Sequence, residues 1–141
     1  MLAYPPPKVN STGARMKLRI KGNSLRLRVT RSELSQMMRN GRIENTIQFA
    51  PEKDASLTFV LERSMDQSEL TVRYRPQEVT IAIPFEEACL WASSDQVRIS
   101  RDLNVGDRVL AVLVEKDFAC LDGRDKDDDD TFTNPNQGSV C

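Results

Sequence analysis

The chain has 141 residues, three cysteines, no histidine and a formal net charge of −1. The lack of histidine excludes the usual Ser–His, Cys–His and histidine–metal mechanisms, and neither a P-loop nor a dinucleotide-binding glycine motif is present. No apolar run approaches the ~18 residues that a membrane-spanning helix needs. We therefore expect a single domain that is not an enzyme, with no cofactor, no metal ion and no membrane partner.

The two ends of the chain differ from the middle. Residues 1–15 contain three consecutive prolines but no apolar segment of the secretory type, so they are expected to form a disordered extension. Residues 122–141 carry six acidic and two basic residues, a composition typical of an acidic, largely disordered tail. The globular domain is expected at residues 16–121. The odd set of cysteines, without close spacing, favours the cytoplasm over a secreted disulfide framework. They are Cys89, Cys120 and Cys141.

The first structured segment is a two-faced β-hairpin. Apolar and basic residues alternate from 17 to 29, and Gly22-Asn23 stands between the two runs as a preferred two-residue turn. This turn places apolar residues opposite apolar ones and basic opposite basic, with Arg19 facing Arg26. Like charges directly opposite each other destabilise a sheet. We therefore expect a counter-charge from a neighbouring strand, from the acidic tail or from an external polyanion.

Two helices and further strands follow. Thr30 and Glu33 form a capping box for a helix that ends at Gly41, and Pro84 is expected as the first residue of a second helix. The continuous apolar run Val109–Val114 predicts a strand buried on both faces. The further strands are expected at Ile43–Phe49, Leu57–Arg63, Leu70–Arg75, Val79–Ile83, Val97–Ile99 and Val109–Val114.

The spacing of these elements repeats. The segment from Val29 through a helix to Ile43 can be laid over the segment from Ile83 through a helix to Val97, which indicates a β-α-β pseudo-repeat. The predicted fold class is α+β, mostly β. About eight strands would form a small barrel or a closed antiparallel sheet with two short helices.

The basic face of the hairpin is the candidate binding site. Arginine and lysine side chains in such a row bind phosphate groups of nucleic acid with salt-dependent affinity. The alternative interpretation is a solvated outer face of a sheet, paired with acidic residues, because no aromatic side chain lies among the charges to stack on bases. The candidate polyanion-binding residues are Lys17, Arg19, Lys21, Arg26 and Arg28, extended by Arg73 and Arg75 if their strand is adjacent.

Two other charged segments have a chemical interpretation. Glu115, Lys116 and Asp117 end the continuous apolar strand and could form an acid–base site, or simply a charged strand terminus. Asp125–Asp129 begins like a calcium-binding loop, but the required glycine at its sixth position and glutamate at its twelfth are missing. The tail is therefore not expected to bind a metal ion.

Two segments resemble a known family. Lys17–Leu27 and Val114–Leu121, the latter followed by an acidic stretch and Asn134-Pro135, resemble small bacterial proteins of unknown function. The resemblance covers Met16 to Cys141 and implies membership without an activity.

A second resemblance is to the swapped-hairpin DNA-binding fold of AbrB-type regulators and MazE-type antitoxins. The similar segments are residues 22–34, 83–99 and 105–109. The chain departs from that pattern by inserting the strands Leu57–Arg63 and Leu70–Arg75 between the two units. This resemblance implies a barrel completed within one chain, and DNA binding.

These observations lead to three functional hypotheses. The first is a small cytoplasmic bacterial module for binding or structure, without a catalytic site, whose partner is another protein or a second copy of itself. The alternative is a nucleic-acid-binding regulator or antitoxin-like protein that uses the basic hairpin Lys17–Arg28. The third is an enzyme that uses Glu115, Lys116 and Asp117.

Overall fold

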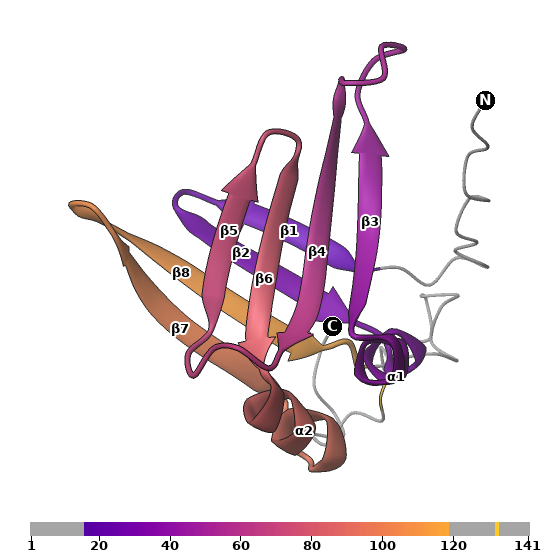
Figure 1. Ribbon diagram of the computed structural model, residues 1–141, viewed down its shortest axis with the longest axis vertical. Helices are drawn as coiled ribbons and strands as arrows, with labels where there is room; N and C mark the ends of the chain where they lie inside the picture. Colours follow the sequence, from indigo (N-terminus) through magenta and orange to yellow (C-terminus); the bar gives the residue numbers. More distant parts are fainter. Residues whose placement is uncertain (1–15, 119–131, 133–141) are drawn as a thin grey trace.

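The computed structural model describes residues 16–118 and residue 132. Its strands form two four-stranded sheets that pack face to face, and both helices lie at one end of the pair (Figure 1). The elements in chain order are β1 (Lys17–Lys21), β2 (Ser24–Val29), α1 (Arg31–Asn40), β3 (Arg42–Gln48), β4 (Ser56–Ser64), β5 (Thr71–Arg75), β6 (Glu78–Pro84), α2 (Phe85–Ser93), β7 (Arg98–Val105) and β8 (Arg108–Lys116).

The chain is built from two copies of one unit, which runs hairpin, helix, hairpin. The first copy comprises β1, β2, α1, β3 and β4, and the second comprises β5, β6, α2, β7 and β8. The first hairpin of each copy pairs with the second hairpin of the other, through the parallel pairs β2–β8 and β4–β6. This exchange gives sheet A the order β1-β2-β8-β7 and sheet B the order β3-β4-β6-β5. The predicted pseudo-repeat is therefore present in the fold.

The predicted class, α+β and mostly β, is confirmed, but the barrel or closed antiparallel sheet is wrong. Among the described residues the two sheets remain separate, and the central pair of each sheet is parallel. The physical reason is that alternation of apolar residues defines the buried face of a strand but carries no information about its neighbour. Strands exchanged between two similar units show the same alternation of apolar residues as the strands of a closed barrel would.

The local signals at the chain's turns are largely confirmed. The β1–β2 register is the predicted one, around Gly22 with φ 56°. Thr30 caps α1 through the predicted capping box, and Gly41 ends it with φ 96°, where a left-handed backbone favours glycine. Pro84 differs from the prediction: it ends β6 in an extended conformation and is the N-cap of α2, so the helix begins at Phe85.

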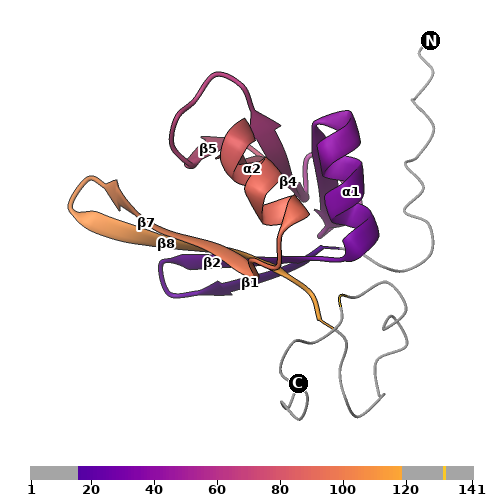
Figure 2. The same cartoon turned by 90° about the horizontal axis from the view of Figure 1, so that it is seen from below.

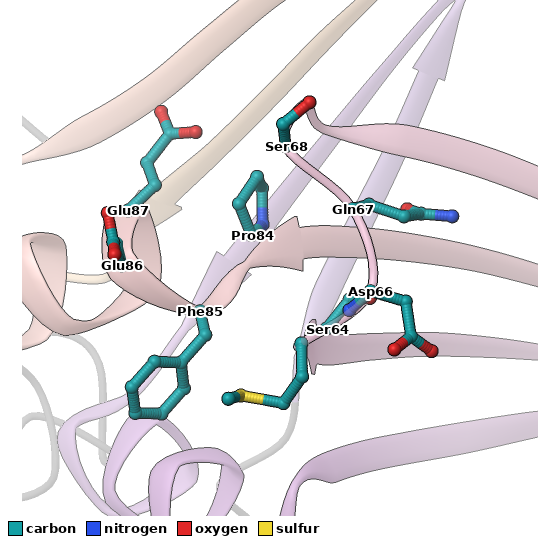
Figure 3. A pocket seen from close by; sticks show the side chains of 9 residues that line it. Ser64, Asp66, Gln67, Ser68, Pro84, Phe85, Glu86 and Glu87 are labelled. Atoms are coloured by element: carbon teal, nitrogen blue, oxygen red, sulfur yellow. The ribbon is translucent and has the colours of Figure 1, made fainter.

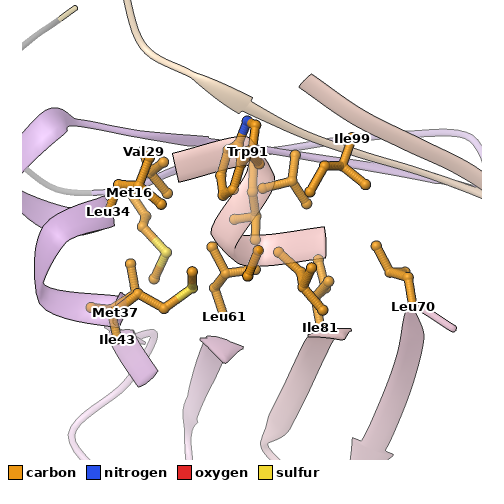
Figure 4. Packing of buried hydrophobic residues seen from close by; sticks show 14 of the residues in the cluster. Met16, Val29, Leu34, Met37, Ile43, Leu61, Leu70, Ile81, Trp91 and Ile99 are labelled. Atoms are coloured by element: carbon orange, nitrogen blue, oxygen red, sulfur yellow. The ribbon is translucent and has the colours of Figure 1, made fainter. Parts of the chain in front are cut away.

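The core fills the space between the sheets at the helical end (Figure 4). Trp91 of α2 is fully buried there, and its Nε1 donates a hydrogen bond to the Val97 carbonyl at 3.1 Å. The prediction that β8 is buried on both faces is wrong. Val112 and Val114 point into the core, whereas Leu113 is half-buried and Val109 is 51% exposed. The other side of β8 belongs to the outer face of sheet A.

Both helices lie on the side of sheet A that faces sheet B, as the view from below shows (Figure 2). No helix of the described residues covers the outer face of sheet A. Within the same residues, no helix has the length and apolar composition needed to cross a membrane. The expected 1–15 extension, the acidic tail except for residue 132, Cys120 and Cys141 lie outside the described residues.

Candidate functional site: a basic face on sheet A

The outer face of sheet A carries an excess of positive charge, and we call it the basic face. Its cross-strand rows follow from the register: Lys17 lies beside Arg28, and Arg28 beside Glu115. Among the described residues, six basic side chains share the face with three acidic ones. The basic residues are Lys17, Arg19 and Lys21 on β1, Arg26 and Arg28 on β2, and Arg98 on β7; the acidic residues are Asp102 on β7, Glu115 on β8 and Asp117 after it.

Glu115 is the counter-charge that the basic hairpin requires. Its side chain is only 5% exposed, and its Oε2 accepts hydrogen bonds from the Nε atoms of Arg26 at 2.7 Å and Arg28 at 2.8 Å. Burial alone would raise the pKa of the Glu115 carboxyl. The hydrogen bonds and charges of Arg28 and Arg26 outweigh this effect and hold its pKa below the ordinary value. Glu115 therefore stays ionised and holds two guanidinium groups side by side.

A second acidic residue holds the edge of the basic face. Asp117 is buried, and its Oδ2 lies 3.0 Å from the Nζ of Lys17. The backbone fixes Asp117, because its N–H donates to the Val29 carbonyl at 2.8 Å. A cavity of about 170 Å³ opens among the paired strands, lined by Lys17, Leu18, Arg19, Arg26 and Arg28.

The candidate residues of the hairpin are thus brought together, but Arg73 and Arg75 are not. These two lie on β5, at the edge of sheet B, so they do not extend the basic face. Arg73 pairs with Glu62 at 3.0 Å. By contrast, the side chains of Arg19 and Lys21 are exposed and form no ion pair or hydrogen bond within the described residues.

The hypothetical acid–base site at the end of β8 does not form as a unit. Glu115 and Asp117 are held by Arg26, Arg28 and Lys17, as described, whereas Lys116 points into the molecule. Its Nζ donates to the Ser94 carbonyl at 2.8 Å and lies 5.3 Å from the centre of the Phe132 ring. Desolvation lowers the pKa of Lys116, against the opposing charge of Asp95. The three side chains therefore have separate partners and form the charged end of a strand.

Two other cavities differ in character from the basic one. The larger, about 560 Å³, lies at the start of α2 and is lined by carboxylates such as Asp66 and Glu86 (Figure 3). Glu87 in this cavity pairs with Arg101. The third, about 430 Å³, lies between α1 and α2 and includes Met38. Neither gathers cations, and no group of three or more His, Cys, Asp or Glu among the described residues could hold a metal ion.

Four members of the basic face were not among the residues predicted for it: Arg98, Asp102, Glu115 and Asp117. Arg98 lies opposite Glu115 on the neighbouring strand, and Glu115 itself was interpreted as a possible acid–base group. The signal for Glu115 was its place in the alternation, since it stands one residue after the inward-facing Val114. Only the parallel pairing of β2 with β8 places it beside the arginines.

Comparison with known proteins places the chain in a family. No curated protein and no solved structure matches it, and no match links it to the swapped-hairpin regulators. A family model described as "Family of unknown function (DUF7009)" matches residues 16–136. This span includes every described element of both sheets. The chain therefore belongs to this family of unknown function.

Proposed function

We propose that the chain is a small, non-catalytic module of the bacterial cytoplasm that binds nucleic acid through its basic face. The observation that carries the proposal is the unbalanced charge of that face, six basic against three acidic side chains. Repulsion among like charges costs stability, and phosphate groups would relieve it. The cytoplasmic part of the proposal rests on the odd cysteine set.

The arrangement favours contacts with the phosphate backbone over reading of bases. The strands of this face carry no aromatic side chain among their charges within the described residues, so they offer no stacking platform. Arg19 and Lys21 are exposed and are available to phosphate oxygens. We therefore expect binding that depends strongly on salt and weakly on sequence.

A salt titration tests this proposal. Fluorescence anisotropy with a labelled duplex should give an affinity that falls about 40-fold between 50 and 200 mM salt, if about three phosphates are contacted. The double variant R19E/K21E should abolish binding. The matched control R39E/R75E makes the same change in net charge on exposed residues outside the basic face and should retain it. Salt-independent binding, absence of binding by the unmodified protein, or equal losses in both variants would contradict the proposal.

Protein binding or self-association is a second candidate, favoured by exposed apolar side chains away from the helices. Ile20, Phe49 and Tyr74 are 62%, 68% and 74% exposed. Light scattering over a range of protein concentrations would detect a second copy. A constant monomer mass at all concentrations would exclude self-association. Binding to another protein would then have to be shown by capture of a defined partner.

A further inference from the structure

The cavity on the basic face lies among the basic side chains of β1 and β2. Lys17 lies opposite Arg28, and Arg19 opposite Arg26, so the Cα atoms of four basic residues lie at the corners of a rectangle. The sides of this rectangle are ~5 Å across the strands and ~7 Å along them. The cavity between these side chains has a volume of about 170 Å³. This is room for a compact anion such as a phosphate group.

The charges around the cavity do not cancel. The four cations meet two carboxylates, because Glu115 is shared by Arg26 and Arg28, and Asp117 pairs with Lys17. The four basic and two acidic side chains named here therefore sum to +2 within the part of the chain that the structure describes. A phosphate monoester carries about −1.5 to −2 at pH 7, whereas a phosphodiester inside a nucleic-acid strand carries one negative charge. The charge of a terminal phosphate monoester therefore matches the cavity better than the charge of an internal phosphodiester.

The donors are also preorganised. A guanidinium group has five N–H donors. Arg28 donates one of them, its Nε–H, to Glu115 and Arg26 donates through Nε, while the buried carboxylate fixes the position of both groups. Arg19 has no ion pair or hydrogen bond within the described residues. Fixed cations that retain unused donors bind a compact anion without paying the full entropy of ordering long side chains.

We propose that this cavity binds a terminal phosphate monoester, so that the module recognises the 5′-phosphorylated end of a nucleic-acid strand. The inference rests on the proposed function and names the part of the ligand that the cavity takes. Lys21, further along β1, and Arg98, on β7 beyond Glu115, lie on the same face and would then meet the phosphodiesters that follow.

The test compares two oligonucleotides of one sequence, with a 5′-phosphate or a 5′-hydroxyl. At pH 7.5 the phosphorylated strand should bind about tenfold more tightly, the effect of one or two charge-assisted hydrogen bonds. The variant Arg19→Gln should remove this preference, and the exposed control Arg75→Gln should retain it. At pH 5 the preference should fall, because the second ionisation of the phosphate lies near pH 6. Glu115 and Asp117 are the carboxylates paired with the cations that line the cavity, and the lowered pKa of Glu115 keeps that carboxyl charged.

The outcomes separate this inference from the proposed function. Equal affinity for both oligonucleotides overturns the phosphate site while nucleic-acid binding stands. If neither oligonucleotide binds, the proposed function fails, and a titration with phenyl phosphate tests the cavity alone. Saturable binding that Arg19→Gln abolishes would support a phosphate monoester site for another ligand. The absence of any phenyl phosphate binding would overturn the site itself.

Discussion

The outer faces of the two sheets have the same construction but different charge. In sheet A the hairpin β1–β2 lies beside β8, and in sheet B the equivalent hairpin β5–β6 lies beside β4. The outer face of sheet B holds three basic and three acidic residues, which are Arg42, Arg73, Arg75, Glu44, Glu62 and Glu78. The outer face of sheet A has six basic and three acidic residues. Similar backbones therefore support a balanced face and an unbalanced one.

The difference is clearest at two carboxylates. Glu115 on β8 and Glu62 on β4 hold comparable places in the two units, each beside the central hairpin strand of the other unit. Glu62 is 19% exposed and pairs with one arginine, Arg73. Glu115 is 5% exposed and holds two. In sheet B, Glu62 and Arg73 form an ordinary surface ion pair. In sheet A, the single carboxylate of Glu115 is shared by two arginine side chains.

The largest predicted effect comes from removing these acids one at a time. Glu115→Gln should lower the free energy of unfolding by about 2 kcal/mol, because two guanidinium groups lose the negative charge of a largely buried carboxylate. Glu62→Gln should cost about 0.5 kcal/mol, as expected for an exposed pair. Urea unfolding of both variants measures the two costs. Equal costs would mean that the two sheets do not differ in the way described.

The effect of Glu115 should also depend on pH. Its pKa in the folded protein lies below the ordinary value of 4.5, so its contribution is complete above the unfolded pKa and is lost as pH falls through the folded pKa. The difference in stability between the unmodified protein and Glu115→Gln should therefore be full at pH 7 and should shrink below about pH 4.5. Urea unfolding at pH 7, 5 and 3.5 measures this trend. A difference that grows on acidification would show that the assigned direction is wrong.

Arg19→Gln and Arg73→Gln should change the stability of the fold by smaller amounts and with opposite sign. Arg19 faces Arg26 without a counter-charge of its own, so Arg19→Gln should stabilise the fold by about 0.3 kcal/mol. Arg73 has a partner in Glu62, so Arg73→Gln should destabilise by about 0.5 kcal/mol. Thermal unfolding at low salt detects both changes. Salt at 1 M should reduce both differences, because it screens exposed charges. Destabilisation by both variants would remove the argument that binding relieves repulsion.

The sequence predicted the local features that depend on neighbouring residues. The Gly22-Asn23 turn, the register of β1–β2 and the Thr30 cap each follow from contacts within a few residues. The pseudo-repeat also followed, because the two strand–helix–strand segments have the same spacing. These features therefore required no knowledge of which strands meet in space.

The sequence failed where distant segments meet. The parallel pairing of β2 with β8 is specified by packing between the two units, and no local pattern encodes it. Without that pairing, Glu115 could not be placed beside Arg26, and β5 could not be assigned to sheet B. The counter-charge was correctly expected from a neighbouring strand, as one of three sources, but its residue was found only in the structure.

The measurement that tests the central claim most directly is a side-chain NMR titration. Arginine Nε–H signals of the full chain can be followed while the 5′-phosphorylated oligonucleotide is added. We expect the signals of Arg19, Arg26 and Arg28 to shift and saturate together, while those of Arg73 and Arg75 on sheet B do not change. Equal shifts on both sheets, or shifts confined to sheet B, would contradict the claim that the unbalanced face of sheet A is the binding surface.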